Sequence, residues 1–298
     1  MNSDPQTAKM IYTEIINFIN KTKKLLHDKS VIEVNSVIPL AEKTVNFMSS
    51  SSDLNYYAVN YYDVDDLYIS HSANVAIFST TIGIGLKYKL DDLVLLCASG
   101  ILHDVGAGRI PGKIVEGDTD NLTKQEIYFF QKHSELGYNS IKKNTPQMEH
   151  IANIAFQHHE KFNGTGFPKK LKGDAIHKHA QIISMVDSFE SLIHPRRHRD
   201  TIVPPVGIKQ ILQRKGNFFS TPMLKALLEY ISVYPVGVYV KLISNEIGRV
   251  LELSPKNPLR PIVRILYNSK GQKCEPYNLN LVDEHLMSIK QCIPMNQK

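Results

Sequence analysis

The chain has 298 residues, of which 42% are hydrophobic and 21% charged, and its formal net charge is +6 at pH 7. This length suits one large core with a satellite, or two domains, and the composition excludes an intrinsically disordered chain. No apolar run approaches the roughly 18 residues of a membrane span, and the three cysteines lack metal-ligand spacing. The N-terminus carries no secretory pattern, so we expect a cytoplasmic protein.

Apolar residues recur at helical spacing from the start of the chain. Residues 6–27 are predicted to form an amphipathic helix, and a second helix covers roughly 32–49. The polar run 49–53 is a candidate boundary. We therefore predict an N-terminal helical region over 1–55. It is either a regulatory or dimerisation domain, or a set of helices that lengthens the following bundle.

Helical patterns continue through the middle of the chain, at about 64–87, 91–103, 123–143, 147–160, 178–193, 205–215 and 221–232. Thr123 and Glu126 form a capping box that defines the start of one helix. From residue 234 onward, period-two apolar segments are separated by Gly, Asn and Pro. The predicted fold is mostly α: a helical domain over 56–232, followed by a small antiparallel β element and tail over 233–298.

Five histidines and two aspartates along this helical middle could build one metal centre. Neutral imidazole and carboxylate are ligands of divalent iron, manganese and zinc, and the absence of thiolates favours iron or manganese over structural zinc. Asp187 lies among apolar helix residues, where an unpaired carboxylate would be costly to bury. A set of seven ligands is large for one ion and suits two. The candidates are His71, His103, Asp104, His133, His158, His159 and Asp187.

Positive charge is concentrated in residues 161–215, which contain eleven Lys and Arg against four Asp and Glu. A basic segment beside a metal site favours an anionic ligand, although a solvated basic face is an equal alternative. Duplex nucleic acid is not expected, because no recognised binding motif accompanies the charge.

Several of these strings resemble a known family. His103-Asp104-Val105-Gly106, followed by Ile110-Pro111, looks like the HD motif of the HD superfamily of metal phosphohydrolases. The segment from His158 to Pro168 is similar to the longer signature of its HD-GYP subfamily. The surroundings of His71, His133 and Asp187, and the Tyr234–Gly237 string with Gly248-Arg249-Val250, match in order and spacing. The resemblance covers roughly residues 56–270.

The resemblance implies a cytoplasmic bacterial phosphodiesterase that hydrolyses cyclic di-GMP or a related cyclic dinucleotide through a metal-bridging hydroxide. It implies two divalent ions, with iron preferred and manganese the alternative. One ion would be held by His71, His103, Asp104 and Asp187, and the other by Asp104, His133, His158 and His159. The candidates for substrate contact are Arg196, Arg197 and Lys161, of which the two arginines could equally be ordinary loop residues. Protein partners in bacterial signalling and a homodimer are further expectations.

The sequence also departs from the subfamily pattern. Ala107 stands where a Lys is usual, and Arg109, two residues on, is the candidate replacement in catalysis beside Asp104. Phe167 replaces the signature Tyr. Asn163 and Gln181 replace an Asp and an Arg. Leu67 stands where members with three metals carry a Glu, so we predict two ions.

These departures leave a second interpretation open. Ala107 and Phe167 favour a catalytically weak or inactive sensor that binds a dinucleotide or a protein partner. A third interpretation is another HD-type hydrolase, or a di-iron oxygenase, with a different substrate. The complete ligand set favours the phosphodiesterase.

Overall fold

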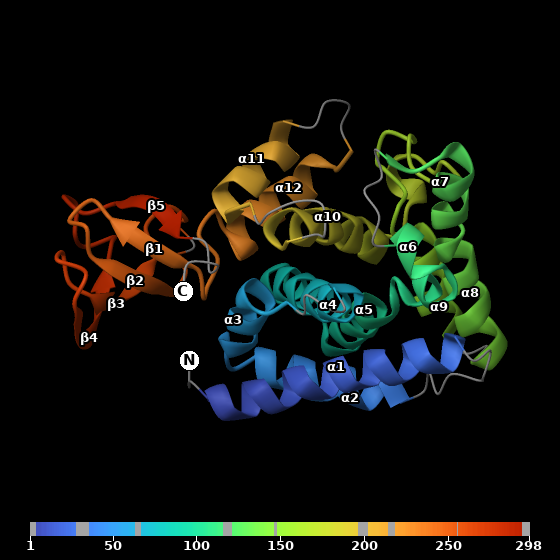
Figure 1. Ribbon diagram of the computed structural model, residues 1–298, viewed down its shortest axis with the longest axis horizontal. Coiled ribbons are helices and arrows are strands. Elements are labelled where there is room, and N and C mark those ends of the chain that lie inside the picture. The colour runs from blue at the N-terminus through green and yellow to red at the C-terminus, as the bar shows by residue number, and fades with distance from the viewer. Residues whose placement is uncertain are drawn as a thin grey trace.

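The described part of the chain consists of helices and one small sheet. The computed structural model describes residues 4–27, 36–62, 67–115, 121–145, 148–195, 202–213, 218–254 and 256–293. The helices form the larger part, and the sheet lies at one end of the molecule (Figure 1). The predicted fold class, mostly α with a small C-terminal antiparallel sheet, is confirmed.

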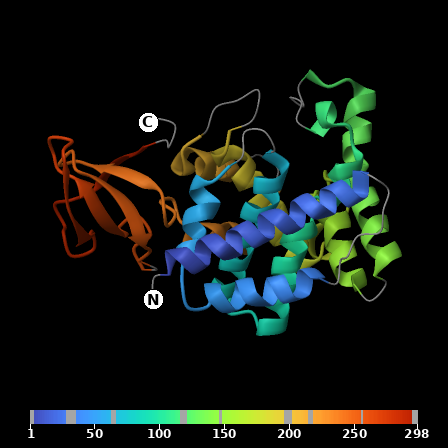
Figure 2. The ribbon, with the colours of Figure 1, turned by 60° about the horizontal axis from the view of Figure 1, so that its bottom comes forward.

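The N-terminal helices pack into the main bundle. α1 (Pro5–His27) buries Ile11, Ile15 and Ile19 on one face and runs across the bundle in Figure 2. α2 (Val37–Met48) buries Val37, Ala41 and Val45. Both helices belong to the same hydrophobic core as the helices that follow. The two helices thus share the core of the bundle, while the role and the limits of the predicted N-terminal region stay a prediction.

A short helix, α3 (Asp53–Asn60), follows the predicted boundary and was not anticipated. Only Leu54 and Ala58 are buried on it. Two apolar positions spaced i and i+4 are too few to register as a helical period in the sequence.

The central helices carry the candidate metal ligands. They include α4, which starts at the first described residue after a gap, and α10, which crosses the bundle above it in Figure 1. Their bounds are α4 (Leu67–Gly85), α5 (Leu90–Leu102), the 3-10 turn η2 (Val105–Arg109), α6 (Gly112–Val115), α7 (Lys124–Gln131), α8 (His133–Asn144), α9 (Glu149–Gln157), the 3-10 turn η5 (Gly173–Ala175) and α10 (Lys178–Ile193).

The single helix predicted over 123–143 is two helices. The capping box of Thr123 and Glu126 starts α7 as expected, but α7 ends at Gln131 and α8 begins at His133. The ring of His133 bonds through Nδ1 to the carbonyl of Phe130, three residues earlier. A side chain that takes up a helix carbonyl competes with the backbone ladder and interrupts it.

The chain then forms α11 (Pro204–Gln213), α12 (Thr221–Ala226) and the π-helical turn η6 (Leu227–Ile231) before entering the sheet. All strand pairs are antiparallel, in the order β4-β3-β2-β1-β5. The strands are β1 (Tyr239–Leu242), β2 (Ile247–Glu252), β3 (Ile262–Tyr267), β4 (Lys273–Asn280) and β5 (Ile289–Ile293).

The two edge strands, β4 and β5, were not anticipated from the sequence. β4 is mostly exposed and polar, so it shows no apolar alternation. The central strands bury Val240, Val250 and Val263 in a small core of their own.

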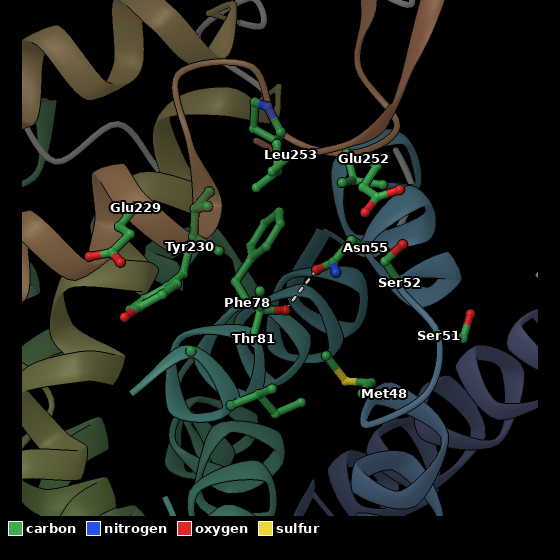
Figure 3. A pocket seen from close by; sticks show the side chains of 15 residues that line it. Met48, Ser51, Ser52, Asn55, Phe78, Thr81, Glu229, Tyr230, Glu252 and Leu253 are labelled. Carbon is green, nitrogen blue, oxygen red and sulfur yellow. Dashed lines mark hydrogen bonds between the residues drawn. The ribbon is translucent and has the colours of Figure 1, made fainter. Parts of the chain in front are cut away.

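A pocket lies where the helices meet the sheet (Figure 3). Phe78 and Thr81 of α4 line it together with Tyr230 of η6 and Leu253 after β2, and Thr81 donates a hydrogen bond to Asn55 (2.8 Å). Its volume is about 280 Å³, and none of the candidate metal ligands lines it. Among the described residues, no helix combines the length and apolar character that a bilayer crossing needs.

Candidate metal centre

The structure brings all seven candidate metal ligands to one place. α4 contributes His71, the end of α5 contributes His103 and Asp104, and the start of α8 contributes His133. The last turn of α9 leads into His158 and His159, and the middle of α10 contributes Asp187. His71, His103, His133 and His158 are buried, and the other three are largely so.

The ligand atoms form two groups. His71, His103 and Asp104 each offer an atom within 4.8 Å of the others, and so do His133, His158 and His159. The rings of His103 and His158, which belong to different groups, lie 5.1 Å apart between centroids. The groups therefore adjoin each other and could each hold a metal ion.

The two aspartates lie between the groups. Oδ1 of Asp104 is 3.3 Å from Nε2 of His133 in the other group. Asp187 directs Oδ1 at Nε2 of His71 (3.2 Å) and Oδ2 toward Nδ1 of His159 (4.0 Å). Asp104 is thus placed as a carboxylate that could bridge two ions.

Three of the histidines are oriented by the ends of helices. His103 caps α5, His158 caps α9, and His133 follows the cap of α7. Each bonds through Nδ1 to the carbonyl three residues earlier: Gly100 (2.7 Å), Ala155 (2.7 Å) and Phe130. The last carbonyls of a helix lack intrahelical partners, so they accept these ring protons. Donation from Nδ1 leaves Nε2 of the neutral ring as a lone pair that points into the centre.

The Nε2 atoms of His103, His133 and His158 are suited to bind cations. Nε2 of His103 is buried and has no hydrogen-bond partner among the described residues. Nε2 of His133 and Nε2 of His158 face each other at 3.3 Å, although the Nδ1 of each ring already donates its proton to a carbonyl. Two lone pairs at that distance repel unless a positive charge lies between or beside them. A divalent metal ion would satisfy these nitrogens, of which Nε2 of His133 also lies 3.4 Å from the hydroxyl of Ser134.

The electrostatics favour the ligand forms of these side chains. Burial lowers the pKa of His103, and it lowers the pKa of His158 and His159 well below the usual imidazole value, with neighbouring imidazoles adding to the shifts. Burial alone would raise the pKa of the Asp187 carboxyl, but His71, His159 and His103 hold it well below its usual range. Neutral imidazoles beside an ionised carboxylate are what a divalent cation binds.

Behind the ligands lies a buried network that sequence reasoning missed. The carboxylate of Glu190 bonds to Nδ1 of His71, accepts a hydrogen bond from Asn74 (3.2 Å) and lies 2.9 Å from Nδ1 of His194. Tyr12 of α1 donates to Asn74 (2.7 Å). Glu190 therefore sets the orientation and tautomer of His71. The sequence feature that indicates Glu190 is its position three residues after Asp187, among apolar neighbours of α10.

The loop that follows His159 folds back onto that histidine. The carboxylate of Glu160 accepts backbone hydrogen bonds from Lys169 (2.6 Å) and Leu171 (2.9 Å). Phe167 stacks on the ring of His159, with centroids 4.6 Å apart and an interplanar angle of 27°. A Cβ on Gly166 would stand 2.4 Å from the carbonyl of His159. The signature string thus covers His159 with an aromatic ring.

The predicted catalytic and substrate-binding residues do not all lie at the metal centre. Lys161 donates to Ser184 (2.9 Å), and its ammonium lies 5.2 Å from the centroid of the Phe219 ring. Arg109 is exposed and lines a separate cavity with Ala107, Tyr68, Lys23 and Lys24. Arg196 and Arg197 fall outside the described residues. Leu67 begins α4, but its side chain is not among those described.

The chain matches two protein families. The family described as HD domain matches residues 37–219, more than half of the chain, and the family described as KOW domain associated with HD domain matches residues 239–297.

Curated relatives are similar to parts of the chain. The chain is 26% identical over 228 residues to the cyclic di-GMP phosphodiesterase PdeB of Borreliella burgdorferi, covering 76% of this chain and 57% of the relative. It is 32% identical over 130 residues to the 3'3'-cGAMP-specific phosphodiesterase 2 of Vibrio cholerae, covering 43% of this chain and 25% of the relative. The chain therefore spans just over half the length of the first relative and a quarter of the length of the second.

A solved structure shares the fold. Bd1817, an HDG"Y"P protein from Bdellovibrio bacteriovorus, aligns with a TM-score of 0.64 at 22% identity, covering 76% of this chain and 72% of that one. The predicted HD superfamily membership is confirmed, and the HD-GYP subfamily stays a prediction.

Proposed function

We propose that this chain, which belongs to the HD domain family, is a metal-dependent phosphodiesterase that hydrolyses cyclic di-GMP or a related cyclic dinucleotide. The observation that carries the proposal is the set of three Nε2 atoms on His103, His133 and His158, each on a ring whose Nδ1 bonds to a helix-end carbonyl, beside two carboxylates. The names of the relatives, phosphodiesterases of cyclic di-GMP and of 3'3'-cGAMP, support the substrate class.

Each group of ligands would hold one divalent ion, preferably iron, with manganese as the alternative. His71, His103, Asp104 and Asp187 would hold the first, and Asp104, His133, His158 and His159 the second. When bound, such ions supply Lewis acidity that acidifies water and offsets the charge of the scissile phosphate. The protein's own part is positional: Glu190 orients His71, and three helix-end carbonyls orient His103, His133 and His158. Phe167 covers His159 and limits access of bulk water to it.

Two groups of basic side chains would offset the phosphate charge that the metal ions do not neutralise. Lys161 follows His159 in the chain and lies close enough to lower its pKa. Lys23, Lys24 and Arg109 line the cavity that also contains Tyr68, whose hydroxyl donates to the backbone carbonyl of Asp104 (2.9 Å). This cavity brings positive charge next to Ala107, where the subfamily's usual lysine is missing.

A second candidate function is a sensor that binds the dinucleotide with little or no turnover. The observation that favours it is the environment of Ala107, which is buried and cannot present a cation. The cavity with Lys23, Lys24 and Arg109 would then retain the ligand instead of assisting its cleavage.

In either case we propose a cytoplasmic location, since the three cysteines are free thiols. Protein partners and a homodimer stay predictions.

One assay separates these functions. The purified chain, loaded with ferrous iron or manganese under anaerobic conditions, is incubated with cyclic di-GMP and, separately, with 3'3'-cGAMP, and the products are resolved by chromatography. The phosphodiesterase yields linear dinucleotide or mononucleotide, and His103→Ala abolishes the product and lowers the iron or manganese content. Full metal loading and measurable ligand binding without product would instead support the sensor. Turnover that survives His103→Ala would refute the proposed metal centre.

A further inference from the structure

A second histidine cluster lies away from the candidate metal centre. His150 is at the start of α9, His177 caps the start of α10, and His179 lies in the first turn of α10. Each of the three offers a ring nitrogen within 4.8 Å of the others. Their ring centroids are 4.5 Å (His150 and His177), 5.0 Å (His177 and His179) and 5.6 Å (His150 and His179) apart.

Two nitrogens of this cluster are buried without a partner in the part of the chain that the structure describes. They are Nε2 of His150 and Nδ1 of His179, which are shielded from solvent and bond to no described residue. His179 itself is 5% exposed. Buried polar atoms in native proteins are normally satisfied, so two orphaned nitrogens on neighbouring rings call for a shared ligand. The same signature, an orphaned Nε2, marks His103 in the first centre.

We propose that His150, His177 and His179 form a separate site for one divalent transition-metal ion of the zinc type, with the fourth position open to water. An all-imidazole set of three ligands plus water is a known coordination pattern of zinc. Bonds of about 2.0–2.1 Å in a tetrahedral arrangement place the nitrogens about 3.3 Å apart, so the rings close in slightly on binding.

The surroundings favour a cation at this place. The carboxylate of Asp92, at the start of α5, acts electrostatically on all three rings. Burial lowers the pKa of each of the three histidines, that of His179 to about 4, which keeps the rings neutral and able to coordinate. Tyr88 lies beside the His179 ring, with 5.6 Å between centroids, and limits its movement.

Ion binding would compete with the cap of α10. Nδ1 of His177 accepts a hydrogen bond from the backbone N–H of His179 (3.1 Å). A neutral imidazole has only one lone pair on its two nitrogens, and here the cap uses it. Coordination by His177 therefore requires either that Nδ1 leaves the cap or that the ring proton moves to Nδ1. Either change breaks the hydrogen bond that caps the start of α10.

The site is connected to the candidate metal centre through two helices. His150 precedes His158 by eight residues along α9, and His179 precedes Asp187 by eight residues along α10. At a rise of 1.5 Å per residue each pair is separated by about 12 Å. An ion that joins the starts of α9 and α10 would thus hold together the two helices that deliver ligands to the other centre.

The test is the zinc content of four variants and the wild type. Each protein is stripped with a chelator, dialysed against excess Zn²⁺, freed of unbound ion and analysed for zinc per chain. His150→Gln, His179→Gln and His177→Asn should each hold one equivalent fewer than the wild type. His285→Gln, at an exposed histidine of the sheet region, should match the wild type. Equal zinc content in the wild type and the three cluster variants would overturn the proposal.

Two further measurements keep the test decisive. Asn is a favourable N-cap residue, so His177→Asn keeps an acceptor for the start of α10 while removing the imidazole, and its circular dichroism should match the wild type. His103→Ala, which removes a ligand of the first centre, should still hold the equivalent that His179→Gln loses. Loss of that equivalent in His103→Ala would show that the two clusters are one site and would refute a separate one.

Discussion

The backbone carbonyl of His133 occupies the space beside Gly106 where a Cβ atom would stand: a Cβ built on Gly106 lies 2.0 Å from that oxygen and 2.4 Å from the amide nitrogen of Gly137. The turn after His103-Asp104 therefore packs directly on the backbone at the start of α8. This contact brings Asp104 of one ligand group to 3.3 Å from His133 of the other.

Gly106→Ala should separate the two ligand groups. The added methyl meets backbone atoms that cannot rotate away, so we expect a loss of at least about 1–3 kcal/mol in the free energy of unfolding. The measurement is urea unfolding followed by circular dichroism. Gly112→Ala is the matched control, because its Cβ would have no atom of the described residues within 4 Å. Equal stability of the two variants would contradict the packing described for Gly106.

Glu190→Gln should weaken metal binding without removing a ligand. The glutamine keeps the size of the side chain but not the charge that holds the His71 ring. Loss of an outer partner of this kind typically lowers metal affinity about 10–100-fold. Competition with a chelating dye measures the affinity. Glu229→Gln, at an exposed position on η6, should bind metal as the wild type does. An unchanged metal affinity in Glu190→Gln would show that Glu190 does not orient His71 for metal binding.

Arg109→Met should lower the turnover of a cyclic dinucleotide while the metal content stays constant. A charge-assisted contact is worth about 1.5–3 kcal/mol, which corresponds to roughly a 10–100-fold loss in kcat/KM. Arg264→Met, at an exposed arginine of β3, is the control. Identical kinetics for Arg109→Met and the control would show that the cavity of Lys23, Lys24 and Arg109 does not serve the substrate.

The metal-free protein should lose stability in mild acid through His179. Burial, with His177 and His150 adding to it, lowers the pKa of His179 from 6.5 to about 4. Between these two values the unfolded chain binds more protons than the folded one, so the free energy of unfolding falls as the pH drops. The loss from this group is on the order of 3 kcal/mol and is nearly complete at pH 4.

Urea unfolding in the presence of a chelator, at pH 7 and at pH 4.5, measures this loss. His179→Gln should show a smaller drop in stability between the two pH values, whereas His285→Gln should keep the full drop. A drop of the same size in both variants would contradict the assignment.

The three cysteines should react with a thiol reagent at very different rates. Burial raises the pKa of Cys97 and of Cys292 to about 12, so at pH 8 both remain protonated and inaccessible. Cys274 is only half-buried. One thiol should therefore react quickly in the native protein and all three in denaturant. Rapid labelling of Cys97 in the native state would show that the contact between α4 and α5 opens.

Much of the fold could be predicted because long helices repeat their apolar positions locally. The periodicity of residues 6–27 and 178–193 predicts α1 and α10 with almost correct limits. α3 is too short to show a period, and the polar edge strands β4 and β5 are strands only because β3 and β1 offer them hydrogen bonds. The break before His133 depends on a ring-to-carbonyl bond that no periodicity reports.

The identity and order of the candidate ligands were determined by the sequence itself. Histidine and aspartate have their coordination chemistry wherever they lie, and the strings around His103 and His158 indicate the family. Only the tertiary structure decided how these groups face one another. Glu190 reaches His71 from 119 residues away, the lone pairs of His133 and His158 meet at 3.3 Å, and His150 joins His177 and His179 in a cluster of their own. Ligand chemistry is a property of single residues, whereas the direction of a lone pair depends on how the helices that carry it end and pack.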